Sequence, residues 1–224
     1  MGGQNHQPCS KYVENSTKLS RFLSLAYAEL ELGNVALEDL ILTELGGGRG
    51  SVEPILARLH VSREAINEAL LTTTRLREQM DANDFLDLPG LRTMDLDTKG
   101  AQLAAHAMVS ADAWKRIAEI MQVGGFYAVL PHFAACMQTL LQKTETLIES
   151  IGGLAEEAAR GEVTATVETN RPRNIKQPFA ELYTAWKIFQ QDFLASALLS
   201  TELWYASRGY GSLVPEGVPA AVHA

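Results

Sequence analysis

His132 and Cys136 are the two residues whose types and spacing come closest to a reactive site. They stand four residues apart, so on a helix both side chains would lie on one face. An imidazole beside a thiol is the start of a cysteine nucleophile or of a soft metal site. A nucleophile also needs a group that orients the base, and a metal needs further ligands, and neither accompanies this pair. We keep His132 and Cys136 as a reactive candidate but predict no catalytic residue, metal or cofactor, because a thiol on a helix more often simply packs.

Residues 51–80 have the spacing of a helix-turn-helix, the commonest DNA-reading motif. The chain would turn at His60–Val61, and Ser62 would cap the second helix. That helix would present Arg63 and Asn67, whose side chains can read base edges. Glu64 and Glu68 lie on the same face, and their negative charges would be repelled by the phosphates. DNA binding through Ser62, Arg63 and Asn67 is therefore an alternative, and a plain pair of helices is the simpler interpretation.

Three other stretches resemble functional motifs incompletely. The glycine-rich segment 46–51 follows no strand and lacks the Lys-Ser/Thr pair of a phosphate-binding loop, so we interpret it as a connector. Arg171 and Arg173 could hold a carboxylate or a phosphate, but such a pair is more often simply a solvated turn. Residues 190–192 (Gln-Gln-Asp) could orient an attacking water, although opposite an aromatic stripe they read by default as a wet helix surface.

The composition favours a chain with a real core and no membrane contact. Of 224 residues 46% are apolar, and the net charge of -8 argues against a general binder of nucleic acid or anionic membranes. No apolar run reaches the roughly 18 residues of a membrane span, and the polar N-terminus does not resemble a secretory signal. The chain has 2 cysteines, not placed as a disulfide framework, so we expect a cytoplasmic location.

A seven-residue repeat from Phe126 to Ala158 is the clearest architectural signal. Apolar residues recur at alternating steps of four and three, and Thr144 is the one polar residue on the line. Such a helix has a narrow apolar seam that it cannot bury alone, so it needs a partner helix. The seam consists of Phe126, Leu130, Phe133, Met137, Leu140, Thr144, Leu147, Ile151, Leu154 and Ala158.

A second long helix is predicted from Pro178, since proline suits the first position of a helix. It is long enough to return along the seam helix as an antiparallel partner. Between the two helices, 163–167 alternates like a short strand. The apolar face of the second long helix is the most aromatic stripe of the chain. It consists of Phe179, Leu182, Trp186, Phe189 and Phe193, continued by Ala197 and Trp204.

The predicted fold class is all-α: a helical bundle with a long antiparallel C-terminal helical hairpin and a smaller N-terminal helical region. In the N-terminal region a first helix is expected to end at Gly33–Asn34, because glycine and asparagine are typical of helix C-termini. The predicted segments are a disordered tail (1–15), the N-terminal helical region (16–83), a linker rich in aspartate (84–100), the C-terminal bundle (101–208) and a flexible tail (209–224).

The absence of a complete catalytic constellation directs the functional hypothesis to binding. We expect a non-enzymatic helical adaptor or regulatory subunit that works through a protein partner and through self-association, most simply as a homodimer. Two alternatives stay open: a transcriptional regulator that binds DNA through 51–80, and a cofactor-binding or hydrolytic helical bundle. The candidate interface residues are Phe133, Leu140, Leu147, Trp186, Phe189 and Phe193.

Overall fold

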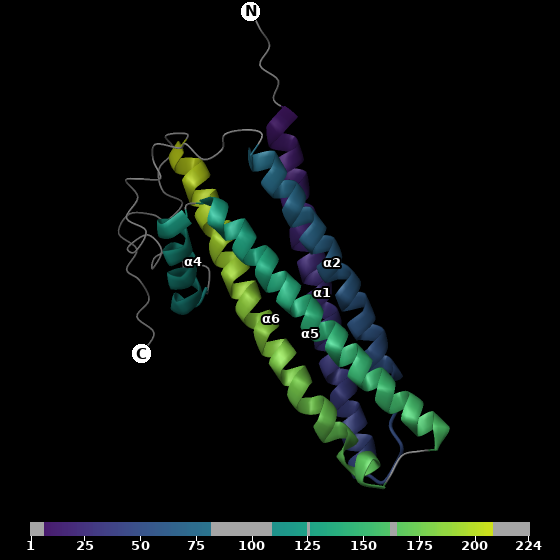
Figure 1. The fold of residues 1–224 in the computed structure, drawn as a ribbon. Coiled ribbons are helices and arrows are strands. Elements are labelled where there is room, and N and C mark those ends of the chain that lie inside the picture. Colours follow the sequence, from purple (N-terminus) through teal and green to yellow (C-terminus); the bar gives the residue numbers. More distant parts are fainter. Residues whose placement is uncertain (1–6, 82–108, 125, 162–164, 208–224) are drawn as a thin grey trace, which may run out of the picture. The chain divides into compact units, whose positions relative to one another are not determined.

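The computed structural model describes residues 7–81, 109–124, 126–161 and 165–207, and the elements within these ranges are helices (Figure 1). The predicted all-α helical-bundle class is therefore confirmed. None of the described helices is long and apolar enough to cross a membrane. The helices are α1 (Gln7–Leu45), α2 (Glu53–Asp81), α4 (Ala111–Gly124), α5 (Phe126–Arg160) and α6 (Ala165–Ser207).

The helices divide between two compact units, and α2, α5 and α6 contribute to both. Unit 1 contains α1, α2 up to Leu76, α5 from Ala135 and α6 up to Trp186. Unit 2 contains the last residues of α2 from Arg77, α4, α5 up to Ala134 and α6 from Lys187. The predicted linker 84–100 and the predicted tail 209–224 lie outside the described residues.

Unit 1 is a four-helix bundle whose helices lie side by side in Figure 1. Each helix buries a line of residues spaced alternately by four and three, which is the spacing of helices that pack at a shallow angle. The buried lines are Leu19, Leu23, Ala26, Leu30, Gly33, Leu37 and Leu40 on α1; Ile55, Leu59, Ser62, Ile66, Ala69, Thr73 and Leu76 on α2; Met137, Leu140, Thr144, Leu147 and Ile151 on α5; and Ile175, Phe179, Leu182 and Trp186 on α6.

The seam predicted on α5 is confirmed at its described positions from Leu130 to Ile151, which are buried, while Leu154 is half-buried. Thr144 fits this apolar line because its hydroxyl donates to the Leu140 carbonyl at 2.8 Å, so no polar group is left unsatisfied. Pro131 lies inside α5, five residues after its start, and does not begin the helix.

The prediction that a helix ends at Gly33–Asn34 is wrong, because α1 continues to Leu45. Gly33 is buried on the α1 line, and a Cβ atom there would stand 3.1 Å from Cζ of Phe179 on α6. The glycine leaves room for an aromatic ring and does not terminate the helix. At its other end α1 already starts at Gln7, so it includes more than half of the predicted tail 1–15.

The glycine-rich segment after α1 closes that helix, as the interpretation of 46–51 as a connector implied. Gly47 has a positive φ of 80°, a conformation that glycine adopts without strain. Its N–H donates to the Glu44 carbonyl at 3.1 Å, and the N–H of Gly48 donates to the Thr43 carbonyl at 3.0 Å. This pair of bonds is a Schellman motif, which satisfies the last carbonyls of the helix.

The prediction of a turn at His60–Val61 is also wrong, because α2 is one helix of 29 residues. Ser62, expected to cap a recognition helix, lies in its middle and is fully buried. Its hydroxyl donates to the Ala26 carbonyl of α1 at 3.1 Å, so the serine joins two helices of the bundle. Without the turn, residues 51–80 are not a helix-turn-helix.

The last helix begins earlier than predicted. α6 starts at Ala165, not at Pro178, so the expected strand at 163–167 is wrong from Ala165 onward, and 162–164 lie outside the described residues. Arg171 and Arg173 therefore lie on a helix and not in a turn.

Candidate functional site

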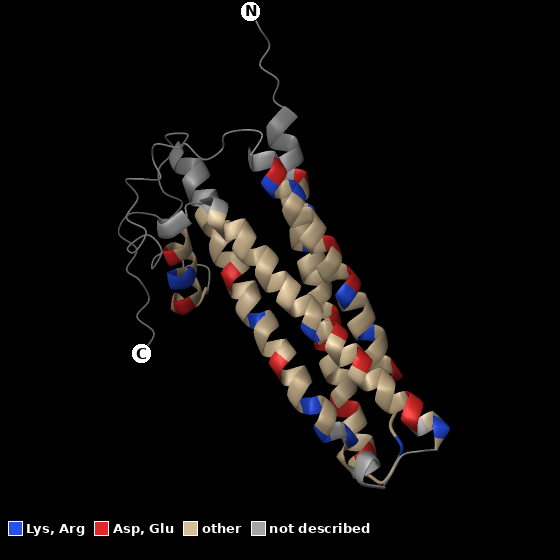
Figure 2. Ribbon diagram, viewed as in Figure 1, with Lys and Arg blue, Asp and Glu red and all other residues tan. Residues whose placement is uncertain are grey.

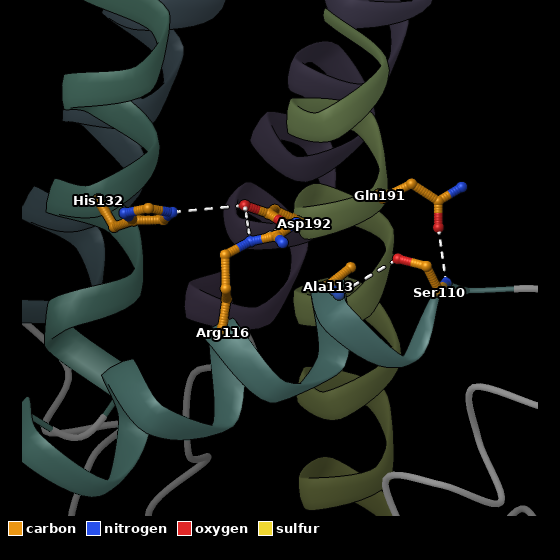
Figure 3. A network of polar contacts seen from close by, with 6 residues as sticks. All are labelled: Ser110, Ala113, Arg116, His132, Gln191 and Asp192. Atoms are coloured by element: carbon orange, nitrogen blue, oxygen red, sulfur yellow. Dashed lines mark hydrogen bonds and ion pairs between the residues drawn. The ribbon is translucent and has the colours of Figure 1, made fainter. Parts of the chain in front are cut away.

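A buried carboxylate forms the main polar cluster among the described residues of unit 2. Asp192 of α6 is 3% exposed, although the sequence suggested a wet helix surface at this position. Arg116 of α4 donates from Nε to both carboxylate oxygens, at 3.1 and 3.2 Å, and Nη2 donates to Oδ1 (Figure 3). A guanidinium that engages both oxygens is a strong and geometrically specific partner for a buried charge.

His132 of α5 completes this cluster, which we call the Asp192 network. Its Nε2 lies 3.6 Å from Oδ2 of Asp192 (Figure 3). This distance is too long for a hydrogen bond, and the contact is an ion pair only when the imidazole is protonated. The network thus links α4, α5 and α6 through one carboxylate.

The start of α4 is held against α6 by a second set of polar contacts. Ser110 accepts a hydrogen bond from the N–H of Ala113 at 3.2 Å and so caps the helix. The N–H of Ser110 donates to Oε1 of Gln191 at 2.9 Å (Figure 3). The apolar face of α4, which consists of Trp114, Ile117, Ala118 and Met121, is buried.

The contacts of the Asp192 network hold helices together and do not form a complete catalytic or metal site. A histidine beside a carboxylate is a common beginning of acid–base catalysis, but here the carboxylate is already engaged by a guanidinium. The described residues contain no group of three or more His, Cys, Asp or Glu side chains that could hold a metal ion. Cys136, the predicted partner of His132, is half-buried and belongs to unit 1.

Two tyrosines and a glutamate form a polar cluster in unit 1 that no sequence pattern predicts. The hydroxyl of Tyr183 on α6 donates to Oε1 of Glu31 on α1 at 2.5 Å. The rings of Tyr27 and Tyr183 stack with centroids 6.3 Å apart. The Glu31 carboxylate, followed by burial, raises the pKa of Tyr27 and of Tyr183 above the ordinary value, so both phenols stay protonated and remain donors at neutral pH.

A line of exposed apolar residues runs along the outer side of α1. Leu25, Leu32, Val35 and Leu42 are 43%, 46%, 53% and 67% exposed, and Ala28 on the same line is also exposed. They follow the same alternation of four and three as the buried line of α1, interrupted by the exposed Asp39. We call Leu25, Ala28, Leu32, Val35 and Leu42 the α1 stripe. A count of seven-residue repeats from Leu25 would have revealed it in the sequence.

The residues predicted for a dimer interface are used inside the chain. Phe133, Leu140, Leu147, Trp186 and Phe189 are at most 4% exposed, and Phe193 is half-buried. In unit 2 the ring of Phe133 packs edge-on against Phe189, with the ring centroids 5.7 Å apart, and its centroid lies 5.9 Å from that of the Phe193 ring. These six side chains therefore form core contacts, and a protein partner would have to use another surface.

The residues predicted to read DNA do not form a basic face. Ser62 is buried, Arg63 pairs with the neighbouring Glu64 at 2.6 Å, and Asn67 is exposed. Figure 2 shows acidic and basic residues interspersed along the described helices. A surface of this kind lacks the concentrated positive charge that binds phosphates.

No family model matches the chain, and neither a curated protein nor a solved structure is similar to it. The function must therefore be argued from the contacts and surfaces described above.

Proposed function

We propose that the protein is a helical adaptor that works through protein–protein contacts and that the α1 stripe is its docking surface. The observation that carries the proposal is the alignment of the exposed apolar residues of α1 into one line. Single exposed leucines are ordinary on a protein surface, but several apolar residues in one line at coiled-coil spacing are typical of a helix that receives another helix.

The helix that carries the stripe is firmly held on its other side, which a docking surface requires. The buried line of α1 packs in the bundle, Arg58 pairs with Glu29 at 2.9 Å, and Ser62 bonds to the Ala26 carbonyl. A preorganised helix loses little conformational entropy when a partner binds. Covering a largely exposed leucine contributes about 1 to 2 kcal/mol, so a stripe of this length supports binding of a partner helix.

The other two hypotheses draw less support from the geometry. A DNA-binding regulator would need the turn and the basic face that 51–80 do not provide. A hydrolytic protein would need an accessible group at 190–192, but Asp192 is buried against Arg116.

The proposal is tested with a doubly substituted stripe, Leu32→Gln with Val35→Gln. The matched control is Leu71→Gln on α2, because Leu71 is 45% exposed but lies on another helix. Both variants should keep the helical content and the unfolding midpoint of the unaltered chain, since the changed side chains are largely exposed.

Proteins captured by the unaltered chain from an extract of the native cells should be identified, purified and titrated back by calorimetry. We expect the stripe variant to weaken binding of the purified partner at least about tenfold and the Leu71 variant to leave it unchanged. Equal affinity of the stripe variant and the control would contradict the proposed docking surface.

A further inference from the structure

Charged residues of opposite sign flank the uninterrupted part of the α1 stripe, from Leu25 to Val35. Arg21 stands one step before Leu25 on the line, and Asp39 stands between Val35 and Leu42. Both charged side chains are exposed, as is the stripe between them. A surface with a cation at one end and an anion at the other is complementary to itself when one copy is turned end to end.

From this complementarity we infer that the stripe receives the α1 stripe of a second copy, antiparallel and related by a two-fold axis. The inference rests on the proposed docking surface and names its occupant. If the axis lies between the two stripes at the level of residue 30 along α1, Arg21 of each copy faces Asp39 of the other. The same arrangement places Leu25 against Val35 and Ala28 against Leu32, each pair occurring twice.

The pairing satisfies three requirements of a helix–helix contact at once. Apolar residues meet apolar residues, the small side chain of Ala28 near the axis lets the helices approach, and the charges at the ends attract. In a parallel pair Arg21 would meet Arg21 and Asp39 would meet Asp39, which is repulsive. The charges therefore select the antiparallel orientation.

Two glutamates flank the stripe near the proposed axis, and each already has a partner within its own chain. Glu29 pairs with Arg58 at 2.9 Å, and the carboxylate of Glu31 accepts the hydrogen bond of Tyr183. The positive charge of Arg58 and the phenolic donor reduce the repulsion between like carboxylates of the two copies.

The experiment is sedimentation equilibrium of the full chain across 1 to 100 μM, at low and at high salt. The unaltered chain should form dimers, and Leu32→Gln with Val35→Gln should be monomeric over the same range. Arg21→Asp and Asp39→Arg should each raise the dimer dissociation constant about tenfold, because each creates two repulsive pairs at the ends. The chain carrying both charge reversals should regain the affinity of the unaltered chain, since the two attractive pairs are restored.

The association states of the unaltered chain, the stripe variant and the charge-reversed chains decide between the possible interpretations. A monomeric unaltered chain at 100 μM overturns the inference, and so does a dimer that the stripe substitutions leave intact. Dimers that the double reversal fails to restore overturn the antiparallel pairing. If the unaltered chain is monomeric while the stripe variant still loses a purified foreign partner, the docking surface stands and only its occupant is wrong. If the stripe affects neither association, the proposed function fails as well.

Discussion

Units 1 and 2 solve the problem of a polar group inside a helical core in different ways. In unit 1 the buried polar residues Ser62, Thr72, Thr73 and Thr144 are neutral, and each donates to a backbone carbonyl. In unit 2 the buried Ser196 is also neutral, but the buried Asp192 carries a formal charge and depends on a side chain from another helix. A neutral hydroxyl can be accommodated with a local bond, whereas a buried carboxylate requires a specific distant partner. Unit 2 should therefore be the more sensitive to single polar substitutions.

The largest expected effect comes from Arg116→Ala, which leaves the Asp192 carboxylate buried without its guanidinium. We expect a loss of about 2 kcal/mol in the free energy of unfolding, below the range for a fully buried pair because the Arg116 side chain is 40% exposed. Urea denaturation measures the loss, and hydrogen exchange should place it in α4. Lys115→Ala on the exposed side of the same helix is the control, and an equal loss there would contradict the role given to the pair.

A second test measures how the stability contributed by the polar cluster of unit 1 depends on pH, because this cluster contains protonated phenols. The pKa of Tyr183 is raised in the folded chain, so its contribution to stability is complete below about pH 10, the unfolded value, and declines as the pH rises above it. Tyr183→Phe should cost about 1.5 kcal/mol at pH 7, since a hydrogen bond to a charged group is lost. The difference between the two chains should shrink above pH 10. An unchanged difference at pH 11 would show that the phenol does not titrate with folding.

The smallest effect separates two glycines inside long helices. At Gly33 an added methyl group would stand 3.1 Å from the fully buried ring of Phe179, whereas at Gly152 it would meet no atom within 4 Å. Gly152→Ala should stabilise the chain by about 0.5 to 1 kcal/mol through helix propensity. Gly33→Ala should lose that gain and destabilise by roughly 1 kcal/mol, because the packed ring cannot move freely. Thermal unfolding of both variants gives the comparison, which fails if the two substitutions shift the midpoint in the same direction.

The role of a residue can be predicted from the sequence when its neighbours along the chain determine that role. It cannot be predicted when a residue on another helix determines it. The seam of α5 was predictable because a repeat of four and three states directly which face is buried. Gly33 was not, because its role is set by Phe179 on another helix. Ser62 was read as a cap because serine suits that position, but its bond to the Ala26 carbonyl holds it inside a helix.

The candidate sites divide in the same way. The α1 stripe is present in the sequence as a second heptad line, which crosses Gly33–Asn34, where the glycine and asparagine predict a helix end. The Asp192 network had no local signal, since a carboxylate between polar residues on a helix is usually solvated, and only the approach of Arg116 from α4 buries it. The spacing of His132 and Cys136 does not indicate the contact that the structure shows, in which Nε2 of His132 lies 3.6 Å from Oδ2 of Asp192.

The glycine under the Phe179 ring has a consequence for how uniquely the bundle can assemble. A helix with leucines at every heptad position looks nearly the same after it slides by seven residues, so such bundles are prone to slipped registers. A slip of α1 by one heptad would bring Ala26 or Leu40 beneath the ring in place of Gly33, and the ring would then collide with a side chain. The absence of a Cβ atom at residue 33 thus allows one register of α1 against Phe179 and disfavours the registers shifted by seven residues in either direction.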